Sequence, residues 1–219
     1  RIRVLYCYPE RITDELLETI ASNEKIVKYL DMPIQHCNSE ILEKMNRWGN
    51  REKLKELIDH IRSKVPGIII RTTIITGFPG ETQEQFDELA EFVQQIRFDR
   101  LGCFPFSQEE GTKAAELDGQ LDDEVKSHRA DILMQQQMLI SAQNNEKQLG
   151  TTHTAVVEGF DKFAGCYFGR TDMDAPDIDG KIFFSSENPL KTGDYVKVKV
   201  SDTLDYDLIG EVIEIEPCK

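Results

Sequence analysis

The sequence predicts a mixed α/β protein with a parallel sheet, followed by a small all-β barrel. In the first 150 residues, apolar β-branched runs alternate with segments of helical periodicity. This alternation is typical of parallel strands joined by right-handed crossover helices. After Gly150, short strand-like segments separated by turn residues replace it. We therefore predict two domains, residues 1–150 and residues 151–219, connected by the long helix before Gly150.

The α/β domain is expected to contain four strands. They are predicted at residues 1–8, at 27–34, in the run from Ile68 to a turn at Gly77, and at 101–106. Helices are predicted after the capping residues Thr13, Ser39, Asn50 and Thr82, and over residues 122–149. Four strands are too few to close an ordinary barrel. We therefore expect the carboxyl-terminal part of a larger barrel whose amino-terminal half is missing.

The second domain is expected to be a closed barrel of five short strands. These are predicted at residues 152–158, 163–170, 181–184, 195–200 and 208–215. The segment Tyr195–Val200 alternates most clearly, with Val196, Val198 and Val200 on one face and Lys197 and Lys199 on the other. Such alternation indicates a strand with one buried face.

The charge of the chain argues against binding to phosphate backbones. The net charge of the chain is −14. Residues 151–219 carry 7 basic and 14 acidic side chains, so their net charge of −7 is half of the total. Nucleic-acid binding favours the opposite sign, whereas a basic protein partner would be attracted. We therefore expect a basic protein as partner and no nucleic acid.

The cysteines and the hydropathy suggest a cytoplasmic protein. Five cysteines lie at positions 7, 37, 103, 166 and 218, and no two have the close spacing of a zinc or redox motif. Scattered cysteines without a secretion signal fit reduced thiols. No apolar run is long enough for a transmembrane helix, so no membrane association is expected.

The segment RTTIITGFPGET, residues 71–82, is the best candidate for a ligand site. It is predicted to be a strand, a tight glycine turn and a helix start, and cofactors bind at such carboxyl ends in parallel sheets. Gly77 and Gly80 would let a ligand approach the backbone. Taken alone, the segment is as consistent with a purely structural turn as with a ligand site. Polar residues that end the neighbouring strands favour a site: Gln35, His36, Ser107, Gln108 and Glu109.

Three stretches carry a family resemblance. MPIQHCNSEILEKMNR, RTTIITGFPGET and FDRLGCFPFSQEEGTKA resemble the carboxyl half of the barrel in the radical S-adenosylmethionine (SAM) methylthiotransferases. The tail resembles their TRAM domain. Its acidic run GRTDMDAPDIDG is similar to the branch that modifies an aspartate of a ribosomal protein, S-twelve, and implies docking of that basic protein by Asp172, Asp174, Asp177 and Asp179.

The resemblance implies a radical reaction with two [4Fe-4S] clusters. One cluster would reduce SAM to a radical that abstracts a hydrogen from the aspartate β-carbon, and the second would hold the sulfur to be inserted. SAM would also donate the methyl group. The family's Cys-x-x-x-Cys-x-x-Cys motif is absent from this sequence. The chain by itself is therefore expected to bind no cluster, to contain no catalytic residue and to be inactive.

By position, the resemblance also implies which residues form the remaining wall of the SAM site. They are Gln35, Arg71, Ile75, Gly77, Glu81, Phe104 and Phe106. Gln35 would contact the ribose or carboxylate of SAM, Arg71 the methionine carboxylate, and the two phenylalanines the adenine. Each has a structural alternative; Arg71 would otherwise pair with a helix carboxylate, and Phe104 would belong to the core. Two other functions remain open, a transfer-RNA methylthiotransferase and a non-catalytic partner-binding module.

Overall fold

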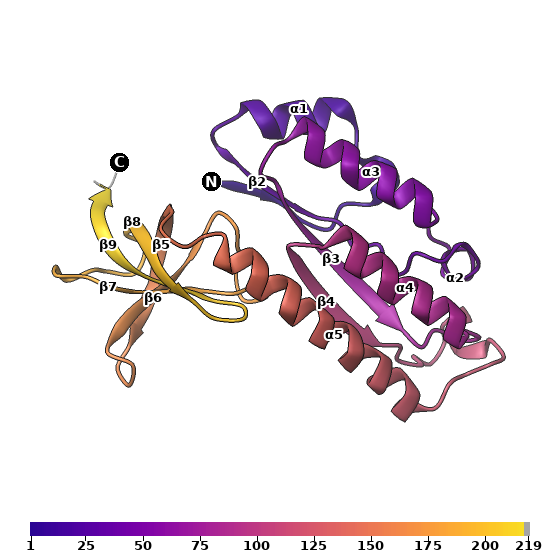
Figure 1. The fold of residues 1–219 in the computed structure, drawn as a ribbon. Helices are drawn as coiled ribbons and strands as arrows, with labels where there is room; N and C mark the ends of the chain where they lie inside the picture. Colours follow the sequence, from indigo (N-terminus) through magenta and orange to yellow (C-terminus); the bar gives the residue numbers. More distant parts are fainter. Residues whose placement is uncertain (217–219) are drawn as a thin grey trace. The chain divides into compact units, whose positions relative to one another are not determined.

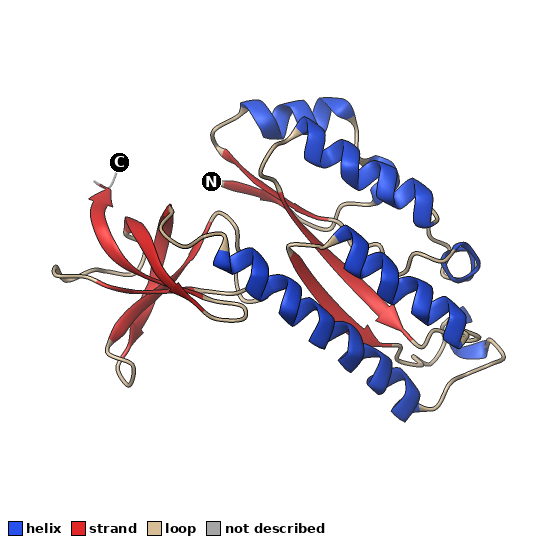
Figure 2. Cartoon of the chain, viewed as in Figure 1, coloured by secondary structure: helices blue, strands red, loops and turns tan. Residues whose placement is uncertain are grey.

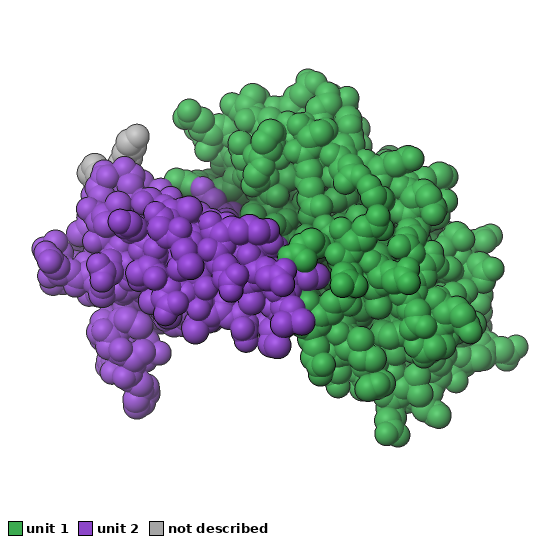
Figure 3. Space-filling model, in the orientation of Figure 1, with its two compact units in different colours: residues 1–137 green, residues 138–219 purple. Residues whose placement is uncertain are grey.

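A computed structural model describes residues 1–216 of the chain. The chain divides into two compact units, residues 1–137 and residues 138–219, which Figure 3 colours separately. Within the described residues, no helix is both long and apolar enough to cross a membrane.

The first unit contains the predicted parallel sheet (Figure 1). Its strands lie in the order β1 (Ile2–Val4), β2 (Ile26–Asp31), β3 (Ile69–Thr76) and β4 (Arg100–Pro105), and all three pairings are parallel. The connecting helices are α1 (Asp14–Ser22), α2 (Ser39–Lys44), α3 (Arg51–Lys64) and α4 (Gln83–Ile96). The long helix α5 (Asp123–Glu146) begins in this unit, and short 3-10 turns lie at Pro9–Arg11 and Lys113–Glu116.

The sheet has two different faces, because burial alternates along β3. Ile70, Thr72, Ile74 and Thr76 are buried on the face that the helices cover, while Ile69, Arg71, Thr73 and Ile75 are only partly buried. Right-handed crossovers place consecutive helices on the same side of a parallel sheet, as Figure 2 shows. The other face, which we call the polar face, has Arg71 and Thr73 beside two isoleucines on β3.

Most helix starts follow the local sequence. Thr13 and Asn50 cap α1 and α3, and Thr82 forms the predicted capping box with Gln85 at α4. The prediction that Ser39 caps α2 was wrong. Asn38 is the cap, because its side-chain oxygen accepts from the backbone N–H groups of Glu40 and Ile41.

The first strand is also shorter than predicted. It ends at Val4, and Tyr6 has a positive φ of 58°. A residue in the left-handed region does not continue an extended strand. The Tyr6 N–H instead donates to a carboxylate oxygen of Asp31 at 3.0 Å.

The second unit contains the predicted five-stranded closed barrel. Its strands are β5 (Thr152–Asp161), β6 (Cys166–Thr171), β7 (Ile182–Ser185), β8 (Tyr195–Thr203) and β9 (Leu208–Glu216), in the order β5-β6-β7-β9-β8. All pairings are antiparallel except that of β7 with β9. The core contains Ala155, Val157, Ile182, Phe184, Val196, Val198, Val200 and Leu208. Gly210 is required where β8 approaches, because a Cβ there would lie 2.4 Å from the carbonyl oxygen of Lys199.

Candidate functional site

The turn after β3 is built around a buried carboxylate, that of Glu81. One of its oxygens accepts from the Gly77 backbone N–H and lies 3.2 Å from Nη1 of Arg129, on α5. The other lies 3.3 Å from Nε2 of His36. The side chains of His36 and Glu81 are fully buried, and that of Arg129 is 8% exposed. We call these three residues the Glu81 cluster; it joins the segment between β2 and α2, the turn after β3 and helix α5.

Gly77 lies against helix α5. Its φ is 71°, which favours glycine, and a Cβ there would lie 2.3 Å from Cγ of Lys126. The packing of α5 therefore requires a glycine here, and the predicted approach of a ligand stays a prediction. Thr76 Oγ1 also donates to the Lys126 carbonyl at 3.1 Å, so the turn is held against α5 on both sides of the strand end.

Gln35 is the predicted residue whose environment points most directly to a ligand. Its backbone pairs with β3, accepting from the Ile75 N–H and donating to the Thr73 carbonyl, each at 2.9 Å. Its φ is 68°, an uncommon value outside glycine. Its side-chain oxygen Oε1 is buried and has no hydrogen-bond partner. Buried polar atoms are nearly always paired, so this oxygen is an exception, which it shares with side-chain atoms of Gln120, Gln137 and Ser141.

Arg71 pairs with a carboxylate of the neighbouring strand, not with a helix. Its Nη1 lies 3.0 Å from Oδ1 of Asp31, and the two side chains are 11% and 1% exposed. Nη1 also donates to Thr73 Oγ1 at 3.2 Å. The pair lies on the polar face of the sheet, beside Arg100 on β4 in register. A methionine carboxylate at Arg71 would therefore share the guanidinium with Asp31.

The remaining predicted residues divide between the polar face and the turn. Ile75 and Phe104 are neighbours in register on β3 and β4, and Phe104 is 55% exposed, so it is not part of the core. Phe106 lies beyond the strand and packs edge-on against Phe78, with 5.2 Å between ring centroids. Glu81 faces the protein interior and has protein partners on both oxygens. Its contact with SAM, like those of the other residues, stays a prediction.

The acidic run of the second unit splits into structural and exposed residues. Asp174 is buried and accepts from Thr171 Oγ1 at 2.9 Å, and Asp179 accepts from the Ala175 N–H at 2.8 Å. Asp172 is half-buried and Asp177 is exposed. Burial lowers the pKa of His153, and the negative charges of Asp174 and Asp172 oppose that shift.

The cysteines of the described residues are not placed as cluster ligands. Cys37 and Cys103 are buried free thiols; burial raises the pKa of Cys37 strongly and that of Cys103 to about 12. Metal-binding cysteines are thiolates. Within the described residues, no group of three His, Cys, Asp or Glu side chains is arranged to hold a metal ion. Cys218 lies outside the described residues.

Sequence reasoning missed the residues that hold this site together. Asp31, Lys126 and Arg129 contact Arg71, Gly77 and Glu81, and only Asp31 lies on a predicted strand. Arg129 lies 48 residues from Glu81, so no local pattern connects them. A basic residue on the buried side of the long helix was the one available signal.

We expect Glu81→Gln to destabilise the first unit strongly. The change leaves the buried guanidinium of Arg129 without its carboxylate, which typically costs about 3–5 kcal/mol. The matched control is Glu91→Gln, whose partner Arg51 lies 3.3 Å away in a pair that is 28% and 71% exposed. An exposed pair contributes about 0–1 kcal/mol. Urea unfolding of the two variants checks this, and equal losses would contradict it.

Comparison with known proteins places both parts of the chain. Residues 2–93 match the radical SAM superfamily, and residues 149–213 match the TRAM domain. The ribosomal protein uS12 methylthiotransferase RimO of Desulforamulus reducens is 46% identical over 97% of this chain and 48% of its own length. RimO of Clostridium botulinum strain Eklund 17B is 48% identical over 100% of this chain and 48% of its own.

Among solved structures, coproporphyrinogen III oxidase HemN of Escherichia coli has a TM-score of 0.48 and 22% identity, over 66% of this chain and 32% of its own. That similarity is too low to add to the assignment. The chain spans about half the length of the curated relatives it matches. Residues 2–93 thus match the radical SAM superfamily and residues 149–213 the TRAM domain, and both of the relatives named above are RimO methylthiotransferases.

Proposed function

We propose that the whole protein adds a methylthio group to the β-carbon of an aspartate in ribosomal protein uS12. The observation that carries the proposal is the identity of 46–48% with proteins named RimO over nearly all of this chain. The pairing of radical SAM sequence with a TRAM domain supports it. The alternative of a transfer-RNA substrate has less support, because residues 151–219 carry twice as many acidic as basic side chains.

The polar face of the sheet has features that suit SAM. Gln35 offers a buried, unpartnered carbonyl oxygen to a ribose hydroxyl or the amino group, and Phe104 offers an exposed ring to the adenine. Gln35 is in register with Ile74, and Phe104 is in register with the adjacent Ile75. When bound, SAM together with an iron–sulfur cluster supplies the hydrogen-abstracting radical and the methyl group. The role of this chain's residues is to bind and orient that cofactor.

The cluster ligands belong, in this proposal, to the half of the relatives' length that this chain does not cover. The donor set of the described residues does not fit a cluster, since Cys37 and Cys103 are buried neutral thiols far apart in sequence. We propose two [4Fe-4S] clusters for the whole protein on the family resemblance. The domain boundary near Gly150 likewise stays part of the proposal.

The substrate partner is proposed to be a basic ribosomal protein in the cytoplasm, with no nucleic-acid or membrane binding by the TRAM domain. Negative charge on one partner and positive charge on the other favours association and orients it. Of the acidic run, Asp177 is the exposed residue, so it is the best candidate for docking. Asp174 and Asp179 stabilise the loop that presents it.

The decisive experiment uses the full-length protein, reconstituted anaerobically with iron and sulfide. Incubation with SAM, a reductant and purified uS12 is expected to add the mass of a methylthio group to one aspartate of uS12. Peptide mass spectrometry locates the modification, and bulk transfer RNA serves as the competing substrate. A methylthio group found on transfer RNA and not on uS12 would overturn the proposal.

Gln35→Ala is expected to weaken SAM binding by about 5–15-fold, because one buried hydrogen bond contributes about 1–1.5 kcal/mol. Gln35→Asn, which keeps the amide and tolerates a positive φ, should retain more of the affinity. Equilibrium dialysis of SAM against the reconstituted full-length protein measures this without turnover. The control is Gln95→Ala, on the outer surface of α4; equal losses in Gln35→Ala and the control would contradict the assignment.

Neutralising an exposed acid of the run should weaken uS12 binding, whereas neutralising a buried acid should mainly affect stability. Asp177→Asn is expected to raise the Kd several-fold and to reduce its salt dependence, while leaving the unfolding curve unchanged. The change Asp174→Asn should instead lower the stability of the barrel. A Kd for uS12 that is unaffected by Asp177→Asn rules out docking by this exposed acid.

A further inference from the structure

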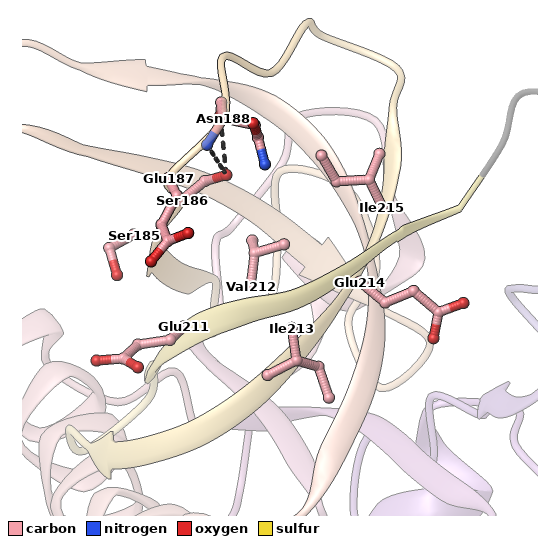
Figure 4. A pocket seen from close by; sticks show the side chains of 9 residues that line it. All are labelled: Ser185, Ser186, Glu187, Asn188, Glu211, Val212, Ile213, Glu214 and Ile215. Atoms are coloured by element: carbon pink, nitrogen blue, oxygen red, sulfur yellow. Dashed lines mark hydrogen bonds between the residues drawn. The ribbon is translucent and has the colours of Figure 1, made fainter.

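A pocket of about 370 Å³ lies on the barrel between the end of β7 and strand β9 (Figure 4). One wall is the turn at residues 185–188, and the other is residues 211–215 of β9. Ser186 fixes the turn, donating to the Asn188 carbonyl at 2.8 Å and accepting from the Asn188 N–H at 3.2 Å. Val212 packs toward the barrel core and forms the floor.

The pocket exists because β7 and β9 separate. Their parallel pairing covers only four residue pairs and ends at Ser185 and Glu211. Strand β9 continues to Glu216, paired with β8 along its other edge up to Tyr195. In the part of the chain that the structure describes, no strand pairs with residues 212–216 on the β7 side. An extended edge of this kind presents backbone N–H and C=O groups to a further strand.

The side chains along this edge combine aliphatic surface with negative charge. Ile213 and Ile215 are 56% and 40% exposed, and Glu187, Glu211 and Glu214 line the pocket. Glu214 is ion-paired with Lys197 at 2.6 Å. Among described residues, Glu187 and Glu211 have no ion pair, although Lys199 stands opposite Glu211 in register. The edge therefore keeps an excess of negative charge.

We propose that this groove binds an extended, basic polypeptide segment, which adds to β9 as a further strand. The unpaired edge would supply backbone hydrogen bonds, and Glu187 and Glu211 would select lysine or arginine side chains. Ile213 and Ile215 suit the aliphatic stems of those side chains. Assigning the segment to the ribosomal protein rests on the function proposed above, whereas the binding of a basic peptide does not.

The test uses the 219-residue chain and a labelled ten-residue peptide of alternating lysine and valine. Fluorescence anisotropy at low salt measures its Kd. Glu187→Lys with Glu211→Lys is expected to raise the Kd at least tenfold. The matched control is Glu146→Lys with Asp205→Lys, which changes two exposed acids of the same unit and alters the net charge equally. The Kd of this control for the peptide should change less than threefold. Equal effects of the two double variants would overturn the proposal.

A second measurement separates strand addition from general charge attraction. Two further peptides carry N-methyl groups on alternate residues, so that one peptide lacks the N–H groups along one of its edges and the other peptide lacks those along the opposite edge. Strand addition predicts that one set loses at least tenfold in affinity and the other little, with slowed amide exchange in residues 212–216. Equal binding of both, preferred binding of single-stranded RNA, or a concentration-dependent dimer that blocks the peptide would each overturn it. Modification of uS12 by the full-length protein without peptide binding would refute the groove and leave the proposed function intact.

Discussion

The first unit depends on one buried charge, the carboxylate of Glu81. It contacts the Gly77 N–H, the His36 ring and the Arg129 guanidinium, which come from the turn after β3, the segment between β2 and α2, and helix α5. A buried carboxylate is stable only when it is paired and hydrogen-bonded. The three elements therefore hold one another in place. Gln35 is next to His36 in the chain, so these contacts also hold its backbone in place. A residue with a positive φ and an unpaired buried oxygen is stable only where the surrounding structure fixes its conformation.

The polar sheet face contrasts with the charge of the whole chain. The chain has a net charge of −14, whereas the basic strand residues of this face lie near carboxylates: Arg71 pairs with Asp31, and Arg100 lies near Asp99. The Arg71–Asp31 pair, 11% and 1% exposed, is neutral as a unit, and its burial limits screening by salt. In the proposed function, a carboxylate-bearing cofactor at this face would therefore meet a guanidinium that already has a carboxylate partner.

Local interactions were predictable from the sequence, and distant ones were not. Thr82 and its capping box follow from four adjacent residues, as does the alternation of Val196 with Lys197. Even Asn38 replaced Ser39 as a cap by a shift of only one position, within the uncertainty of helix ends. By contrast, Gly77 is explained by Lys126, and Glu81 by Arg129, both on a helix that packs from far along the chain. The sequence predicted a turn at Gly77, but the reason for the glycine required the packing of α5.

The acidic side chains of the barrel differ in how well they would suit a basic partner. Acids that hold a loop together are poor docking groups, because Asp174 and Asp179 already accept hydrogen bonds from Thr171 and Ala175. Glu187 and Glu211 are exposed beside an unpaired strand edge. A basic side chain could therefore pair with them without breaking an existing ion pair. Surface charges alone give weak, salt-sensitive attraction, whereas backbone pairing fixes register. A partner bound along β9 would therefore gain orientation as well as affinity, and the reaction proposed above, at a single aspartate, would need both.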